Sequence, residues 1–112
     1  MSARLSAGAL RHRIVLQRRD AIPDEAGGAR TVFTPFATAW AQIVPAAPRR
    51  RPDAAALLTG GEYRLRLRYR TDVRPGMRVL WGPQTLDVLQ VAPLSGERRF
   101  LDLLCREVGD DD

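Results

Sequence analysis

The sequence predicts an all-β fold, a small barrel or sandwich of about six strands. Residues 63–70 read YRLRLRYR, where four arginines alternate with two tyrosines and two leucines, the period of a strand with one apolar face. Residues 77–81 (MRVLW) and 85–92 (TLDVLQVA) flank a Gly-Pro-Gln turn, which indicates a hairpin. No segment has the apolar spacing expected of a long helix.

The first third of the chain contains two predicted strands. Residues 12–18 (HRIVLQR) alternate between apolar and polar side chains and predict the first strand. Residues 19–30 are rich in Pro, Asp and Gly, so we interpret them as a turn-rich connection. Residues 31–44 are rich in β-branched and aromatic residues and predict a long strand, broken or bulged at Pro35 because proline cannot donate to a ladder. Trp40 is predicted to pack in the core.

A long loop is predicted between the second and third strands. Residues 45–61 open with prolines, contain Arg49, Arg50 and Arg51, and close on a Gly-Gly pair. Loops of this length in compact domains are usually functional or disordered. The alternating strand 62–70 follows, and residues 71–76 (TDVRPG) predict a turn.

The rest of the chain completes one predicted domain, residues 1–112. After the hairpin, residues 99–107 (RFLDLLCRE) predict the last strand, with Cys105 as a small core residue. Residues 1–10 are interpreted as an N-terminal arm, and residues 108–112 as an acidic tail.

The charge is distributed unevenly along the chain. The net charge is +5, and every one of the 18 basic residues is arginine. Residues 1–70 carry 13 arginines against five acids, a net of +8, whereas residues 71–112 carry five against eight, a net of −3. Such asymmetry suits either an anionic partner or head-to-tail self-association.

Several functional classes are not supported by the sequence. The single His12 and single Cys105 give no metal-ligand cluster or catalytic triad, and the glycine doublets lack the context of a phosphate loop. We therefore expect no enzymatic activity, no metal and no cofactor. No apolar run is long enough for a membrane helix and no signal peptide is evident, so we expect a cytoplasmic origin and no membrane partner.

Two arginine groups are candidate functional sites. Arg64, Arg66, Arg68 and Arg70 form the polar face of the alternating strand. This face can be solvated or paired across strands, can meet acids of a neighbouring subunit, or can contact DNA. Base stacking is poorly supported, because Tyr63 and Tyr69 lie opposite the arginines. The triplet Arg49–Arg51 can lie near phosphates, be disordered, or contact a subunit.

The order of four segments resembles a known family, the head–tail joining (head completion, or stopper) proteins of tailed bacteriophages and gene transfer agents. The segments are AGALRHRIVLQRR, DEAGGARTVFTPFATAWAQIVP, YRLRLRYRTDVRPGMRVLW, and PQTLDVLQVAP with RRFLDLLCRE. Together they span residues 7–107, and their order and spacing are more specific than any one of them alone.

The resemblance implies a virion neck protein, assembled in the bacterial cytoplasm. Its β-barrel subunits would form a homo-oligomeric ring of six or twelve copies between a portal and adaptor on the head side and a tail terminator on the tail side. That ring would close the DNA-filled head and provide the surface on which the tail docks. The family's loop between the second and third strands implies that residues 45–61, with Arg49, Arg50 and Arg51, approach packaged DNA in the channel.

The charge split suggests how such a ring would form. Ring subunits need two different complementary surfaces, because each copy presents its front to the back of the next. We expect Arg64, Arg66, Arg68 or Arg70 to meet acids within residues 71–112 of a neighbour. The alternative function is a free cytoplasmic β-barrel that binds nucleic acid through arginine, with an affinity that falls steeply with salt.

Overall fold

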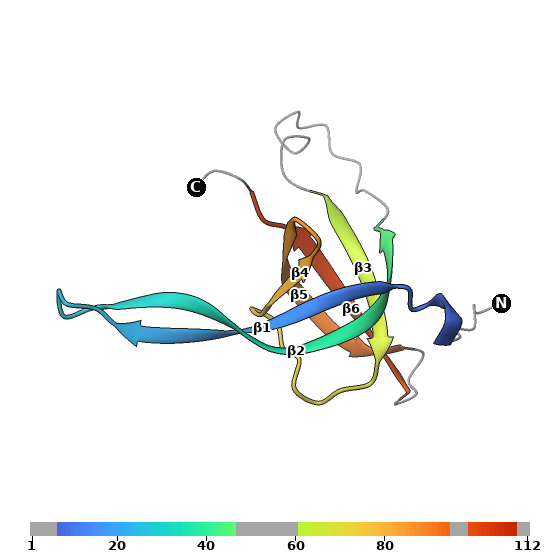
Figure 1. Ribbon diagram of the computed structural model, residues 1–112, viewed down its shortest axis with the longest axis horizontal. Coiled ribbons are helices and arrows are strands. Elements are labelled where there is room, and N and C mark those ends of the chain that lie inside the picture. Colours follow the sequence, from blue (N-terminus) through green and yellow to red (C-terminus); the bar gives the residue numbers. More distant parts are fainter. Residues whose placement is uncertain (1–6, 47–60, 95–98, 110–112) are drawn as a thin grey trace.

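The protein folds as a closed six-stranded antiparallel barrel in a computed structural model that describes residues 7–46, 61–94 and 99–109. The strands follow the order β1-β2-β3-β6-β5-β4 around the barrel, and β4 pairs with β1 to close it (Figure 1). The elements are η1, a single 3-10 turn (Ala7–Ala9), β1 (His12–Pro23), β2 (Ala29–Pro45), β3 (Glu62–Arg68), β4 (Arg78–Trp81), β5 (Gln84–Pro93) and β6 (Phe100–Glu107). The predicted all-β class and the number of strands are confirmed.

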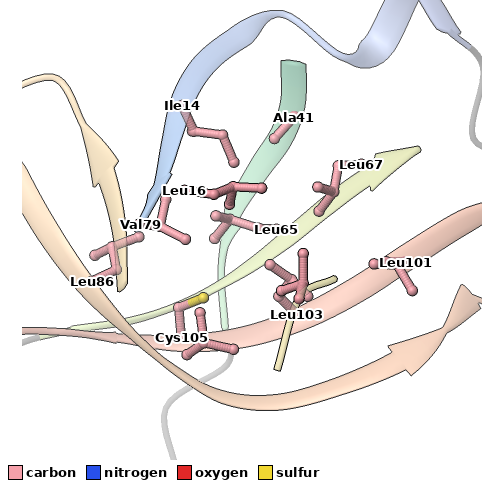
Figure 2. Packing of buried hydrophobic residues seen from close by; sticks show 12 residues of the cluster. Ile14, Leu16, Ala41, Leu65, Leu67, Val79, Leu86, Leu101, Leu103 and Cys105 are labelled. Atoms are coloured by element: carbon pink, nitrogen blue, oxygen red, sulfur yellow. The ribbon is translucent and has the colours of Figure 1, made fainter. Parts of the chain in front are cut away.

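The core lies inside the barrel and receives side chains from all six strands (Figure 2). On β3, Leu65 and Leu67 are fully buried while Arg64, Arg66 and Arg68 face outward, as the alternation predicts. Tyr63 and Tyr69 pack against the same core, although Tyr69 lies just beyond the end of the strand. Cys105 is fully buried, so its predicted place in the core is confirmed.

The connection between β3 and β4 crosses one end of the barrel. This crossover must leave β3, which pairs with β2 and β6, and reach β4, which pairs with β1 and β5. Val73 is buried within it, at 6% exposure. The crossover is tied to β5 by two backbone hydrogen bonds, in which Gly76 donates to Val88 and Val88 donates to Met77, each 2.9 Å long. Gly76 has φ +95°, which favours glycine at this sharp turn.

The first two strands are longer than the sequence predicts. Residues 19–30 are not a loose connection, because β1 runs to Pro23, β2 begins at Ala29, and the strands stay paired out to Pro23↔Ala29. The turn is confined to residues 24–28, where the Asp24 carboxylate accepts hydrogen bonds from the Ala26 and Gly28 N–H groups at 3.0 and 2.9 Å. The prediction failed here because both faces of this ribbon meet solvent, so its sequence lacks the alternation of a half-buried strand.

The ribbon leaves the barrel at a β-bulge. Leu16 pairs with Ala37 and Gln17 pairs with Pro35, so Phe36 is the extra residue on β2. A bulge in this strand near Pro35 was predicted, and it is confirmed. The seam between β1 and β4 ends at Gln17↔Arg78, directly beside the bulge. Beyond it β1 and β2 continue as a two-stranded extension, residues 18–34, which we call the arm (Figure 1).

The prediction for Trp40 is wrong. Its neighbours Ala39 and Ala41 face the core, so the alternation of β2 turns Trp40 to the outside of the barrel. Its side chain is 57% exposed. Trp81 instead closes one end of the barrel, where its ring makes edge contacts with His12 and Tyr63 at centroid distances of 5.6 and 5.4 Å.

Candidate assembly surfaces

The outer face of β3 is paired with β6 through one carboxylate. Asp102 lies opposite Arg66 in the antiparallel register and is reached diagonally by Arg64. Arg64 Nη1 donates to Asp102 Oδ2 at 2.8 Å, and Arg66 Nε donates to Asp102 Oδ1 at 3.4 Å. The Asp102 side chain is only 18% exposed. Two of the four arginines Arg64, Arg66, Arg68 and Arg70, which we call the ladder arginines, therefore already have an acidic partner within the chain.

The other two ladder arginines have different surroundings. Arg68, the last residue of β3, is exposed and makes no ion pair with any residue that the structure describes. Arg70 lies beyond the strand and holds Asp72 through two hydrogen bonds of 2.9 Å, from Nε and Nη2. The structure thus divides the four residues into a paired group (Arg64, Arg66 and Arg70) and an unpaired one (Arg68). A subunit interface at any of them stays a prediction.

The Arg70–Asp72 pair makes a testable prediction about pH. The hydrogen bond from Arg70 lowers the pKa of the Asp72 carboxyl below its usual 3.8, and the same bond raises the Arg70 pKa. Because the folded pKa of Asp72 is depressed, the pair stabilises the fold above the unfolded pKa and loses this contribution as pH falls through the lower folded value. The Asp72 side chain is 49% exposed, so the gain in stability is small.

We expect the NMR titration of the Asp72 carboxyl carbon to have its midpoint below 3.8 in the wild-type protein. In the Arg70→Ala variant the midpoint should return toward the ordinary value, because the donating guanidinium is gone. An unchanged midpoint in Arg70→Ala would show that Arg70 does not hold the carboxylate in solution. Arg68→Ala serves as the matched control, because it removes a nearby arginine that does not contact Asp72.

The second predicted group, Arg49, Arg50 and Arg51, lies outside the described residues. β2 ends at Pro45 and β3 begins at Glu62, so the triplet belongs to the segment between these strands, as the sequence predicts. The two ends of that segment are held together by a backbone hydrogen bond of 2.9 Å from Ala46 to Glu62. The Gly61 carbonyl also accepts a 2.8 Å hydrogen bond from Glu107. The segment therefore leaves and re-enters the barrel at one place, beside β6.

The described residues provide no chemical centre. No group of three or more His, Cys, Asp or Glu side chains among them could hold a metal ion. Burial, and to a lesser extent the charges of Asp87 and Asp102, raises the pKa of the Cys105 thiol to about 12, so the reactive thiolate is disfavoured. Within the described part of the chain, no helix is long and apolar enough to cross a lipid bilayer.

Two surface features were missed in the sequence, the arm and the exposed Trp40. The acid-containing Asp-Glu-Ala-Gly-Gly turn was visible as a turn, but not as the tip of a projecting ribbon. At the base of the arm, the Arg78 guanidinium lies over the Phe33 ring, 4.1 Å from its centroid. This contact joins the arm to β4, whereas residues 21–31 are exposed throughout.

A family model and two solved structures resemble this chain. A family model described as phage head completion protein matches residues 5–108. The solution structure of protein SF1141 from Shigella flexneri 2a is 26% identical, with a TM-score of 0.72 over 96% of this chain and 100% of that chain. A chain from a structure titled "Virion of native gene transfer agent (GTA) particle" is 21% identical, with a TM-score of 0.67 over 88% of this chain and 96% of that chain, and shows the same fold. No curated protein matches the sequence significantly.

Proposed function

The chain belongs to the phage head completion protein family and has a structural role at the phage head; from this premise we propose that it forms a ring at the neck between capsid and tail. The ring closes the DNA-filled head below the portal and adaptor and provides the surface on which the tail and its terminator dock. The family match over nearly the whole chain carries the proposal. The subunits assemble on the head in the bacterial cytoplasm and remain in the virion.

The charge distribution supports head-to-tail assembly. Residues 1–70 carry a net charge of +8 and residues 71–112 a net charge of −3, and this asymmetry favours contact between different parts of neighbouring copies. Among the ladder arginines, only Arg68 is both exposed and without an ion pair to a described residue. It is therefore the strongest candidate to form an ion pair with an acid of a neighbouring copy. Arg64 and Arg66 act first within the subunit, where they join β3 to β6 through Asp102.

Deletion of the gene tests the proposed role. Cells that carry the deletion together with intact head and tail genes should produce tails and heads that do not join, and the heads should lose their DNA. Electron microscopy of the lysate and measurement of nuclease-protected DNA give the two readouts. Supplying the wild-type chain from a plasmid should restore joined particles. Normal numbers of tailed, DNA-filled particles without the chain would contradict the proposal.

The triplet Arg49–Arg51 gives a second, finer prediction. In the proposed ring the segment between β2 and β3 approaches packaged DNA, and arginines there bind phosphates without reading sequence. Replacing all three arginines with serine should leave tail joining intact but reduce nuclease-protected DNA several-fold. Arg64→Ser is the matched control, because that arginine is paired with Asp102 within the barrel. Full DNA retention in the triple variant would show that the triplet does not hold DNA in the channel.

The alternative, a free barrel that binds nucleic acid, has less support. Tyr63 and Tyr69 pack against the core, so the arginine face carries no aromatic side chain of its own strand on which a base could stack. Arg64 and Arg66 are also neutralised in part by Asp102. Tight, strongly salt-dependent binding of DNA by the isolated chain would favour the alternative.

A further inference from the structure

The arm has unpaired backbone edges on both sides. β1 pairs with β4 only through Gln17, and β2 pairs with β3 only from Ala41 onward. From residue 18 outward, the arm is therefore a ribbon of two strands, and its six β1 residues extend about 20 Å beyond the seam. Isolated two-stranded ribbons are marginally stable in water, and free strand edges readily accept a further chain. These features are typical of an element that binds a partner.

The arm and the barrel wall each expose one large apolar side chain. Among the described residues, only two large apolar side chains are exposed, Ile22 at 38% and Trp40 at 57%. Ile22 of β1 lies near the tip of the arm and pairs with Arg30 of β2. Trp40 lies on β2, ten residues beyond Arg30. Ten residues of strand span about 33 Å, so the two side chains cannot meet within one chain.

Charged side chains lie at both places. Residues 20–28 at the arm tip contain three acids and no arginine, and Arg19 and Arg30 flank them. Glu25 is exposed there and makes no ion pair with a described residue, whereas Asp20 is paired with Arg18. On the wall, Arg13 lies directly opposite Trp40 in the register. Arg68 follows Leu67, the partner of Ala41, and so lies on the other side of Trp40.

These wall arginines are available to a partner. Arg13 and Arg68 are both exposed, and neither makes an ion pair with a residue that the structure describes. The row Arg13–Trp40–Arg68, which we call the wall site, thus combines one apolar ring with two cations. The arm tip combines one exposed apolar side chain, Ile22, with one exposed acid, Glu25, while the arm as a whole carries three arginines and three acids. The two surfaces therefore offer an apolar contact and an ion pair to each other.

We propose that the arm tip of one copy binds the wall site of the next copy, with Ile22 against Trp40 and Glu25 facing Arg13 and Arg68. Because the two surfaces differ, the contact is heterologous, and its repetition closes a ring when the rotation between neighbours returns to the first copy. The inference rests on the proposed neck ring and identifies the surfaces that join its subunits. It places Arg68 in the interface, and it places the acidic partner in the arm of the neighbour rather than in residues 71–112.

Disulfide trapping in assembled particles tests the contact. In an Ile22→Cys/Trp40→Cys double variant, oxidation should link each copy to two neighbours and produce a ladder of multimers on a non-reducing gel. Both substituted side chains are exposed, and the natural Cys105 is buried and stays in every variant. The control is Ile22→Cys/Ala92→Cys, because Ala92 is exposed on β5, the strand opposite β2 in the barrel. The control should give a single-chain band.

The outcomes separate the inference from the proposed function. A ladder in the double variant, absent from the control, supports the arm contact. A single-chain band from particles that contain the double variant overturns the arm contact and leaves the neck role standing. Absence of the wild-type chain from purified particles overturns the neck role itself, and the arm inference with it.

A charge exchange gives an independent test. Glu25→Arg and Arg13→Glu should each lower the amount of chain in particles several-fold, because each places like charges in the contact. The double variant Glu25→Arg/Arg13→Glu should recover most of the loss. Thermal unfolding of each purified variant serves as the folding control. Unchanged incorporation of both single variants, with unchanged folding, would overturn the proposed pairing.

Discussion

Replacing Leu103 with alanine is expected to lower the free energy of unfolding by about 2–5 kcal/mol. Leu103 is fully buried on β6, and it lies directly opposite Leu65 of β3. Truncation removes apolar contacts and leaves a cavity that a closed barrel cannot easily collapse, because all its strands are held by neighbours on both sides. The loss should appear as a fall in the thermal midpoint of roughly 10 °C or more.

Leu104 is the matched control for this prediction. It follows Leu103 on the same strand, has the same side chain, and points to the outer face, where it is partly exposed. Leu104→Ala should therefore cost clearly less than Leu103→Ala, measured by urea denaturation of both variants under one set of conditions. Equal losses would mean that the inward and outward faces of β6 are wrongly assigned.

Replacing Leu80 with proline is expected to open the barrel at its seam. β4 has only four residues and pairs with β1 on one side and β5 on the other, so a proline in it removes a ladder hydrogen bond wherever the N–H is directed. Proline in the middle of a β-sheet is found essentially only on edge strands or at bulges, and β4 is neither. The seam consists of three residue pairs, Val15↔Leu80, Leu16↔Val79 and Gln17↔Arg78. The loss of one pair therefore leaves only two pairs to hold β1 and β4 together.

Hydrogen exchange locates the damage caused by Leu80→Pro. Amides of β1 and β4 at the seam should lose protection, whereas those at the β3–β6 pairing should keep more of it. Leu80→Ala is the control, since it shortens the same side chain and leaves the backbone donor in place. Retention of wild-type protection at the seam in Leu80→Pro would show that β4 does not close the barrel.

The sequence predicted the central strands because their two faces differ. On β3 the alternation of leucine and arginine shows which side is buried, and the structure places Leu65 and Leu67 at 0% exposure. The interruption at Pro35 was also predictable, because proline has no N–H to donate to a ladder. The likeness of the segment order to head completion proteins was confirmed by the family match.

The arm could not be predicted, because both of its faces are exposed to solvent. A ribbon of this kind carries no apolar period, and its Pro, Asp and Gly residues suggest a turn longer than the actual residues 24–28. The place of Trp40 was missed for a related reason. On β2, Trp40 lies between the small residues Ala39 and Ala41. The large apolar side chain was predicted to face inward, but the two alanines face the core instead.

The sequence by itself determined which residues face inward in β3 and β6, since local alternation is a property of neighbours along one strand. It also determined the family, through the order of its segments. Only the tertiary structure decided which acids the arginines meet. Arg64 and Arg66 find Asp102 because β3 pairs with β6, a strand more than thirty residues away. Pairing between distant strands depends on how the whole barrel closes, and no local pattern contains that information.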